Sequence, residues 1–226
     1  TMQMADFPYP GHTEYIADKV GSKNSLMLMV SESMRVGLVT AHIPLSEVKN
    51  AISKETIEKK ILQLYQSLRS DFGITKPTIA VLGLNPHAGD DGIIGKEEEE
   101  VINPVIIGLK KKGHMVYGPF AADGFFGSGQ YKKFDGILAM YHDQGLVAFK
   151  ALSFGQGINF TAGLSVIRTS PDHGTGYDIA GKGIADAGSF RNAMMLAIEI
   201  ARYRKEIGSL EENALKKQQS LSKKEN

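Results

Sequence analysis

The chain contains no cysteine among its 226 residues. This absence excludes disulfides, thiolate zinc sites and a cysteine nucleophile. Any transition metal must therefore be held by imidazole or carboxylate groups. The absence also fits the cytoplasm, where proteins do not rely on disulfides for stability.

An excess of charge of one sign and long apolar runs are missing as well. Lys and Arg number 26 against 25 Asp and Glu, so the net charge of +1 supplies no field that attracts a polyanion. Nucleic acid is therefore not the expected partner. No apolar stretch approaches the roughly 20 residues of a membrane helix, and the N-terminus lacks the basic-then-apolar pattern of a secretory signal. We expect a cytoplasmic protein with no membrane partner.

Apolar, partly β-branched runs alternate along the chain with amphipathic segments. Apolar residues recur at helical spacing at positions 57, 61, 64 and 68, after Ser53, which predicts a helix that stops near Gly73. Further helices are expected at 97–112 and 190–204. Short strands are expected at 26–30, 36–41, 78–84, 115–117, 136–140, 158–161 and 166–168. This alternation predicts an α/β protein whose parallel or mixed sheet is covered on both faces.

Two local features refine this pattern. Pro104 lies inside the segment 97–112 and is expected to kink that helix, because proline removes a backbone hydrogen bond at a cost of about 3 kcal/mol. From Gly208 onward the chain is rich in Lys, Gln, Ser and Glu, which predicts a mobile or helical end. We therefore divide the chain into an α/β catalytic region, 1–207, and a polar C-terminal tail, 208–226.

Three of the six histidines follow predicted strands: His42, His87 and His142. In open α/β sheets, ligands bind beyond the carboxyl ends of the strands, so these side chains can converge. Neutral imidazole suits zinc, nickel, cobalt and iron, and three protein ligands leave positions open for substrate oxygens. The pattern predicts one divalent metal in an active site. A loop or core histidine with satisfied nitrogens explains each of the three when it is taken alone.

Basic and amide side chains gather around a glycine-rich segment. Lys150 and Asn159 flank Gly155 and Gly157, which permit close approach of the backbone, and Arg168 is expected to follow a strand. Arginine offers a bidentate fork and lysine a point charge, so a phosphate or carboxylate of a small molecule is the predicted ligand. Each of these residues singly is also typical of a surface charge.

Six segments occur in order from about Gly11 to Ala201: PGHTEY, VTAHIPL, VLGLNPHAGDDG, LAMYHDQGLVAFK, GINFTAGLSVIRTSPDHGT and AGKGIADAGSF. Together they resemble the successive signatures of the 4-hydroxythreonine-4-phosphate dehydrogenase family. The resemblance is specific, because no common loop produces NPHAG and YHDQG together at this spacing. It implies the fold of isocitrate and isopropylmalate dehydrogenases, an α/β/α sandwich with parallel or mixed sheets and an active site in a cleft.

The resemblance also implies roles for single residues. The histidines of VTAHIPL, NPHAG and YHDQG correspond to the metal ligands of the family, and the other matching positions to its substrate-binding residues. The implied metal ligands are His42, His87 and His142, and the implied substrate-binding residues are His12, Thr13, Lys150, Asn159 and Arg168. The general base is not assigned by this resemblance; Asp143 and His173 are candidates by polarity and position.

The implied reaction oxidises the secondary alcohol of 4-phosphooxy-L-threonine with NAD or NADP. The resulting 3-oxo acid decarboxylates to 3-amino-2-oxopropyl phosphate, in the synthesis of pyridoxal 5'-phosphate (vitamin B6). A zinc, magnesium or cobalt ion would lower the pKa of the alcohol and polarise the forming ketone. No G-x-G-x-x-G follows a strand, so NAD is implied by the resemblance alone. The segment 172–175 is a candidate for the nucleotide site, although a plain turn explains it equally well.

The chain begins almost at GHTE, whereas members of the family begin well before it. We therefore expect an incomplete two-domain dehydrogenase that lacks its N-terminal portion, binds metal and turns over poorly. The resemblance also implies a homodimer with metal ligands shared between subunits, so that His142 completes the site of the partner. Three alternatives stay open: a paralogous dehydrogenase of threonate or erythronate 4-phosphate, a non-redox three-histidine metal enzyme, and a non-catalytic binding or oligomerisation module.

Overall fold

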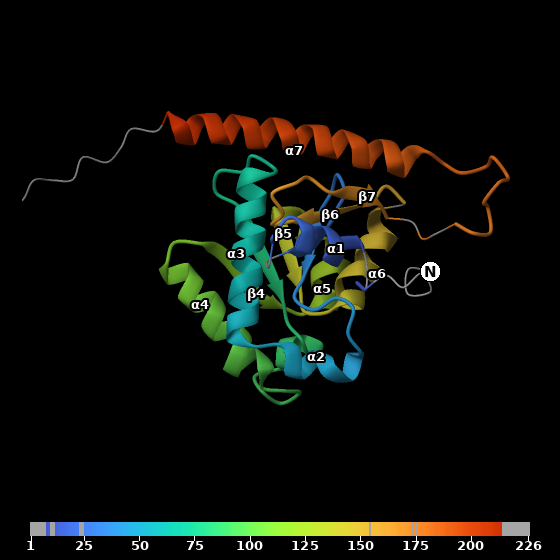
Figure 1. Ribbon diagram of the computed structural model, residues 1–226. Helices are drawn as coiled ribbons and strands as arrows, with labels where there is room; N and C mark the ends of the chain where they lie inside the picture. Colours follow the sequence, from blue (N-terminus) through green and yellow to red (C-terminus); the bar gives the residue numbers. More distant parts are fainter. Residues whose placement is uncertain are drawn as a thin grey trace, which may run out of the picture.

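A seven-stranded mixed sheet forms the centre of the computed structural model, which describes residues 8–9, 12–22, 25–153, 155–172, 174 and 176–213. The strand order is β4-β3-β5-β2-β1-β6-β7 (Figure 1). The strands are β1 (Leu26–Val30), β2 (Arg35–Leu38), β3 (Thr78–Leu82), β4 (Met115–Phe120), β5 (Gly136–Ala139), β6 (Ile158–Ala162) and β7 (Thr169–Pro171). β4, β3, β5 and β2 are parallel to one another, whereas β1 pairs antiparallel with both β2 and β6, and β7 pairs antiparallel with β6.

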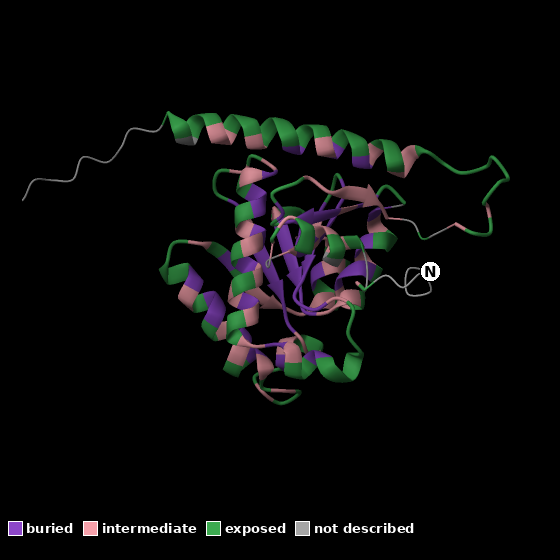
Figure 2. Ribbon diagram, in the orientation of Figure 1, coloured by how far each residue is buried: buried purple, intermediate pink, exposed green. Residues whose placement is uncertain are grey.

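Helices cover both faces of this sheet, as the side chains of β3 show. Ile79 and Val81 belong to one buried cluster, together with residues of α3 (Lys54–Ser70), α4 (Asn103–Lys111) and α7 (Gly188–Glu212). Ala80 and Leu82 belong to a second cluster, with residues of α5 (Ala122–Gly127) and α6 (His142–Ser153). Alternate residues of a strand point to opposite faces, so the sheet lies between two helical layers. The strands at the centre of the sheet are largely buried (Figure 2). The expected α/β/α sandwich is confirmed.

The amphipathic helix expected after Ser53 is present as α3. The Ser53 hydroxyl accepts a hydrogen bond from the backbone N–H of Thr56 at 3.1 Å, which caps the helix. The four apolar side chains at helical spacing, Ile57, Ile61, Leu64 and Leu68, are fully buried. The remaining helical segments are α1 (His12–Lys19), α2 (Leu45–Ala51), η2 (Pro86–Gly89), η3 (Glu98–Ile102) and η4 (Gln130–Lys133).

Two segments differ from their expected form. The helix expected at 97–112 is continuous but begins with η3, a π-helical turn that leads directly into α4; Pro104 lies just after this wider turn, in the first turn of α4. The strand expected at 166–168 is wrong, because the pairing of β6 with β7 places Phe160 opposite Thr169. Val166 is exposed in the turn between these strands, and Arg168 therefore precedes β7 and does not follow a strand.

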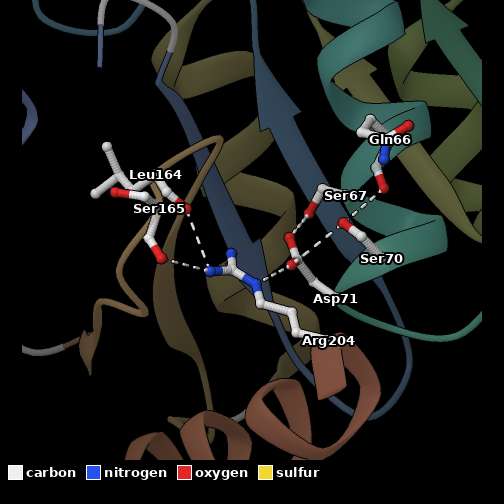
Figure 3. Close-up of polar contacts among 7 residues, drawn as sticks. All are labelled: Gln66, Ser67, Ser70, Asp71, Leu164, Ser165 and Arg204. Atoms are coloured by element: carbon white, nitrogen blue, oxygen red, sulfur yellow. Dashed lines mark hydrogen bonds and ion pairs between the residues drawn. The ribbon is translucent and has the colours of Figure 1, made fainter. Parts of the chain in front are cut away.

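The long helix α7 packs on β7 and β6 and extends beyond the sheet (Figure 1). Its side chains that face the sheet, Ala193, Leu196 and Ile200, are buried, and most of its outer side is exposed (Figure 2). Arg204 fixes its C-terminal half to Asp71 at the end of α3 (Figure 3). The helix runs across position 208 to Glu212, and residues 214–226 lie outside the described residues. No helix in the described part of the chain is long and apolar enough to span a membrane.

Candidate active site

The three predicted metal ligands leave one edge of the sheet. β2, β5 and β3 are parallel neighbours, and their carboxyl ends lead into the segments that carry His42, His142 and His87 respectively. After β2 and β5 end, the two segments stay aligned, because the backbone N–H and the hydroxyl of Thr40 both donate to the carbonyl oxygen of Met140, at 3.2 and 2.8 Å. The topology therefore places the three histidines where ligands bind in sheets of this class.

Two of these histidines lie side by side. The ring centroids of His42 and His142 are 5.8 Å apart, with 44° between the ring planes. Two imidazoles bound to one zinc at about 2.1 Å per nitrogen would have centroids about 5 Å apart, so this pair is compatible with a shared ion. The Nδ1 atom of His142 lies 2.7 Å from Asp143 Oδ1. A carboxylate on one ring nitrogen is the usual arrangement for a metal-bound histidine, and it leaves Nε2 available.

The third predicted ligand, His87, lies on an unusual left-handed turn. Backbone φ is positive at every residue of the turn, namely His87 (54°), Ala88 (52°), Gly89 (87°), Asp90 (46°), Asp91 (50°) and Gly92 (85°). Each residue other than glycine costs roughly 1–2 kcal/mol in this region. Such a turn persists only where the surrounding structure holds it.

In the described part of the chain, no group of three or more His, Asp or Glu side chains is placed to hold a metal ion.

The carboxylate of Glu98 holds the turn. This side chain is 2% exposed, and its Oε1 atom accepts hydrogen bonds from the backbone N–H groups of Leu84 and Asn85, both at 2.7 Å. Its Oε2 atom accepts a third from Asn85 Nδ2 at 2.9 Å. Hydrogen bonds to a carboxylate contribute about 1.5–3 kcal/mol each, enough to offset the backbone strain. A Cβ atom on Gly89 would lie 2.7 Å from Oε2, so the turn closes directly on this carboxylate.

The neighbouring Glu97 joins the same turn to α2. It lies 2.7 Å from Lys49 Nζ and accepts a hydrogen bond from Asn85 Nδ2 at 2.8 Å. The ammonium of Lys49, followed by the amide of Asn85, lowers the pKa of Glu97 from 4.5 to about 2. Because the pKa is lower in the folded state, the contribution of Glu97 to stability is complete above pH 4.5 and is lost as the pH falls toward 2.

We therefore expect Glu97→Gln to be less stable than the wild-type chain at neutral pH. The difference in the free energy of unfolding between the two should shrink as the pH falls from about 4.5 to about 2, because the wild-type carboxylate is protonated over that range. Urea unfolding at a series of pH values measures this difference. The matched control is Glu100→Gln, at an exposed position of the same helical segment. A Glu97→Gln difference that does not vary with pH would contradict this expectation.

A second bridge joins the ends of β3 and β5. Gln144 Nε2 donates to the carbonyl oxygen of Gly83 at 2.6 Å, and Gln144 Oε1 accepts from the backbone N–H of Met140 at 2.7 Å. The Gln144 side chain therefore fixes the start of α6, where His142 lies, relative to β3, the strand that leads to His87. Beside it, a cavity of about 510 Å³ is lined by His87, Asp143, Tyr141 and Phe126, among others. This cavity connects the surroundings of His87 with those of His142.

Sequence reasoning missed the residues that shape this edge. None of them, namely Asn85, Glu97, Glu98 and Gln144, was identified from the sequence as a candidate site residue. The local sequence carries one usable signal, since a glutamate that is buried at a helix start must find several hydrogen-bond donors. Which donors it finds depends on the tertiary fold.

The predicted substrate-binding residues lie toward another part of the sheet. Lys150 is near the end of α6, about 12 Å along the helix from His142, and its Nζ atom lies 3.3 Å from Asp172 Oδ1. Arg168 Nη1 donates to Thr161 Oγ1 at 3.0 Å. Asn159, on β6, has a buried Oδ1 atom with no hydrogen-bond partner among the residues that the structure describes. β6 thus gathers polar groups on the ladder that it shares with β7.

The remaining predicted residues are the substrate-binding residues His12 and Thr13 and the two candidates for a general base. His12 is exposed and Thr13 half-buried in the first turn of α1, and among the described residues no hydrogen bond or ion pair joins either one to the histidines of the sheet edge. Of the two candidates for a general base, Asp143 is 76% exposed and bonded to His142, and His173 lies outside the described residues.

Comparison with known proteins shows extensive similarity. A family model described as pyridoxal phosphate biosynthetic protein PdxA matches residues 1–197. A curated 4-hydroxythreonine-4-phosphate dehydrogenase from Bacteroides thetaiotaomicron is 54% identical over 219 residues, which cover 96% of this chain and 60% of the relative. The chain thus spans about 60% of the length of the curated relatives that it matches.

Solved structures show that the similarity extends to the fold. The crystal structure of 4-hydroxythreonine-4-phosphate dehydrogenase from Klebsiella pneumoniae has a TM-score of 0.79 and 39% identity, covering 88% of this chain and 60% of that chain. A terephthalate 1,2-cis-dihydrodiol dehydrogenase from Burkholderia xenovorans has a TM-score of 0.68 and 28% identity, covering 84% of this chain and 60% of that chain. The same arrangement of elements therefore occurs in dehydrogenases with different named substrates.

Proposed function

Because this chain belongs to the family of the pyridoxal phosphate biosynthetic protein PdxA, with the isocitrate dehydrogenase-like α/β/α fold, we propose that it forms part of a 4-hydroxythreonine-4-phosphate dehydrogenase. The reaction is the NAD-dependent oxidation of 4-phosphooxy-L-threonine in the cytoplasm. The 3-oxo acid product then loses carbon dioxide to give 3-amino-2-oxopropyl phosphate, on the way to pyridoxal 5'-phosphate. The observation that carries this proposal is the pair of imidazoles, His42 and His142, at the carboxyl edge of the sheet.

His42 and His142 would hold a divalent metal, with Asp143 fixing the ring of His142 through Nδ1. The metal would supply Lewis-acid polarisation of the substrate alcohol. Imidazole ligands favour zinc or cobalt over magnesium. Asp143 is exposed, lies at the cavity beside His87, and can accept a proton from a bound alcohol.

The phosphate and carboxylate of the substrate would be bound by the residues around β6. Arg168 offers a bidentate fork, and Lys150 can exchange the carboxylate of Asp172 for that of the substrate, since its side chain is 54% exposed. The unpartnered Oδ1 of Asn159 is an acceptor that the substrate ammonium or hydroxyl can satisfy. His12 and Thr13 of α1 would complete the contacts to substrate.

A homodimer would complete the metal site. We propose that the metal ligands are shared between the two subunits of such a dimer. The surface supports this arrangement, because large apolar side chains flank both elements without cover. Ile43 and Leu45 follow His42 and are 36% and 72% exposed, and Ile93 and Ile94 follow the His87 turn and are 80% and 41% exposed.

The decisive measurement is reduction of NAD with the phosphorylated substrate and zinc, comparing this chain with a version extended to the full length of the relatives. We expect clear activity in the extended protein and weak or no activity in this chain. His42→Ala in the extended protein should abolish activity and bound metal together. His114→Ala, at a histidine packed on the ring of Tyr65 at 4.5 Å, is the matched control and should retain both.

Three outcomes would contradict the proposal. Equal activity of the two versions would show that the additional length is not required. Metal-dependent loss of substrate without reduced nicotinamide would indicate a non-redox metal enzyme. Oxidation of threonate or erythronate 4-phosphate in preference to the threonine derivative would identify the paralogous reaction. This alternative is retained because the chain also resembles a dehydrogenase that is named for a different substrate, a dihydrodiol.

A further inference from the structure

Glu98 carries a buried carboxylate that the proposed reaction does not use directly. It is 2% exposed, and among the described residues no cation lies within ion-pair distance of it. A buried carboxylate without a cation is unfavourable unless several donors surround it. Its donors are the backbone N–H groups of Leu84 and Asn85 and the side-chain amide of Asn85. All three belong to the segment that leads into the turn of His87.

The same carboxylate also closes the far side of the turn. A Cβ atom on Gly89 would lie 2.7 Å from Oε2 of Glu98, and one on Gly83 would lie 3.0 Å from Oε1 and 3.0 Å from the Cα of Ala88. Within the turn, the Ala88 N–H donates to the Asn85 carbonyl oxygen at 3.1 Å, and the Asp90 N–H to that of His87 at 3.3 Å. The backbone before and after His87 is therefore packed around a single carboxylate.

We propose that Glu98 is a positioning residue, whose carboxylate holds the left-handed turn so that His87 is presented to the metal. The inference rests on the proposed function, which makes His87 a metal ligand. It adds a residue in direct contact with neither metal nor substrate. The consequence is specific: the affinity for metal should depend on a side chain 11 positions away in sequence from the histidine that it serves.

Glu98→Gln tests this role, because glutamine has the same shape but turns one acceptor into a donor. An NH₂ group in the place of Oε2 would face the Asn85 amide, which is itself a donor, so that hydrogen bond is lost. We expect cobalt(II), titrated by its visible absorption into the full-length dimer, to bind on the order of tenfold more weakly. Asn85→Ala, which leaves the two backbone hydrogen bonds to Glu98 in place, should show a smaller loss. It serves as the second variant if Glu98→Gln does not fold.

Two controls separate positioning from a general loss of stability. Glu100→Gln, at an exposed position nearby, should bind cobalt as the wild type does. Ile200→Val, in the buried side of α7, should lower the midpoint of thermal unfolding of the metal-free protein and leave cobalt affinity unchanged. Support for the proposal requires that Glu98→Gln weaken cobalt binding in protein that is fully folded at the temperature of the titration.

His87→Ala distinguishes failure of this inference from failure of the proposed function. If His87→Ala weakens cobalt binding at least a hundredfold while Glu98→Gln and Asn85→Ala bind as the wild type, His87 is a ligand that needs no such support, and the inference is overturned. If His87→Ala itself leaves binding unchanged, His87 is not a ligand, and both the inference and the proposed metal site are overturned.

Discussion

Replacing Arg204 with alanine is expected to lower the free energy of unfolding by about 3–5 kcal/mol, the usual cost of removing one partner of a buried ion pair. Arg204 Nε lies 2.7 Å from Asp71 Oδ1, and Asp71 is 2% exposed (Figure 3). Arg204 Nη1 also donates to the carbonyl oxygens of Leu164 and Ser165, at 3.2 and 3.4 Å. Its loss leaves the Asp71 carboxylate buried without a cation and detaches the C-terminal half of α7.

The environment of Asp71 explains why the effect should be large. The hydroxyl of Ser67 donates to Oδ2 of Asp71 at 2.7 Å, so the carboxylate is committed to this position at the end of α3. The side chain of Arg204 is 24% exposed, which lets water relieve part of the cost and favours the lower end of the range. Urea unfolding of the variant, followed by circular dichroism, measures the change.

Arg202→Ala is the matched control, because Arg202 is exposed on the same helix. We expect its unfolding free energy to stay within about 0.5 kcal/mol of the wild type. A double variant, Asp71→Leu with Arg204→Met, should be closer to the wild type than Arg204→Ala, since no charge is then left unpaired. Equal stability of Arg204→Ala and Arg202→Ala would mean that the ion pair does not hold α7.

The strands and the amphipathic helices were predictable because burial on a sheet or helix face leaves a periodic pattern in the sequence. β1 and α3 were expected at the residues where they occur, within a few positions. The placement of His42, His87 and His142 beyond strand ends was likewise predictable. The three strands prove to be parallel neighbours, so the three histidines leave one edge.

Features that depend on distant contacts left no such pattern. The left-handed turn at His87 contains residues that seldom adopt positive φ, and the segment that leads into it is bound by Glu98, from another element. The strand containing Thr169 begins later than expected because its register with β6 decides its position, not the apolar Val166. The pair Asp71 and Arg204 joins residues 133 positions apart, which no local property of the sequence reveals.

The metal site shows the same division between local and tertiary information. The residue types for a three-histidine site could be identified from the sequence, and their role stays a prediction. What the fold adds is that the rings of His42 and His142 lie side by side within one chain. The expectation that His142 completes the site of the partner stays a prediction.

Gly118→Ala is expected to destabilise the chain by about 4 kcal/mol, as the sum of two effects. Gly118, in β4, has a φ of 124°, where an alanine is strained by roughly 1–3 kcal/mol. Its Cβ atom would also overlap the carbonyl oxygen of Val81 in β3, and relieving such an overlap costs roughly 1–3 kcal/mol more. The pairing of β3 with β4 shifts register between Ala80 and Leu82, so the glycine lies opposite this irregularity.

This position also affects the candidate site, because the Phe120 carbonyl oxygen of β4 accepts a hydrogen bond from the N–H of Gly83 at 2.8 Å, just before the turn of His87. Displacing β4 should therefore weaken metal binding as well as stability. Gly108→Ala is the matched control: Gly108 lies in α4 with nothing within 4 Å of a new Cβ, so alanine should stabilise the helix by about 1 kcal/mol. A lower urea midpoint for Gly118→Ala and a higher one for Gly108→Ala would support the close contact between Gly118 and Val81. Midpoints that move in the same direction would contradict it.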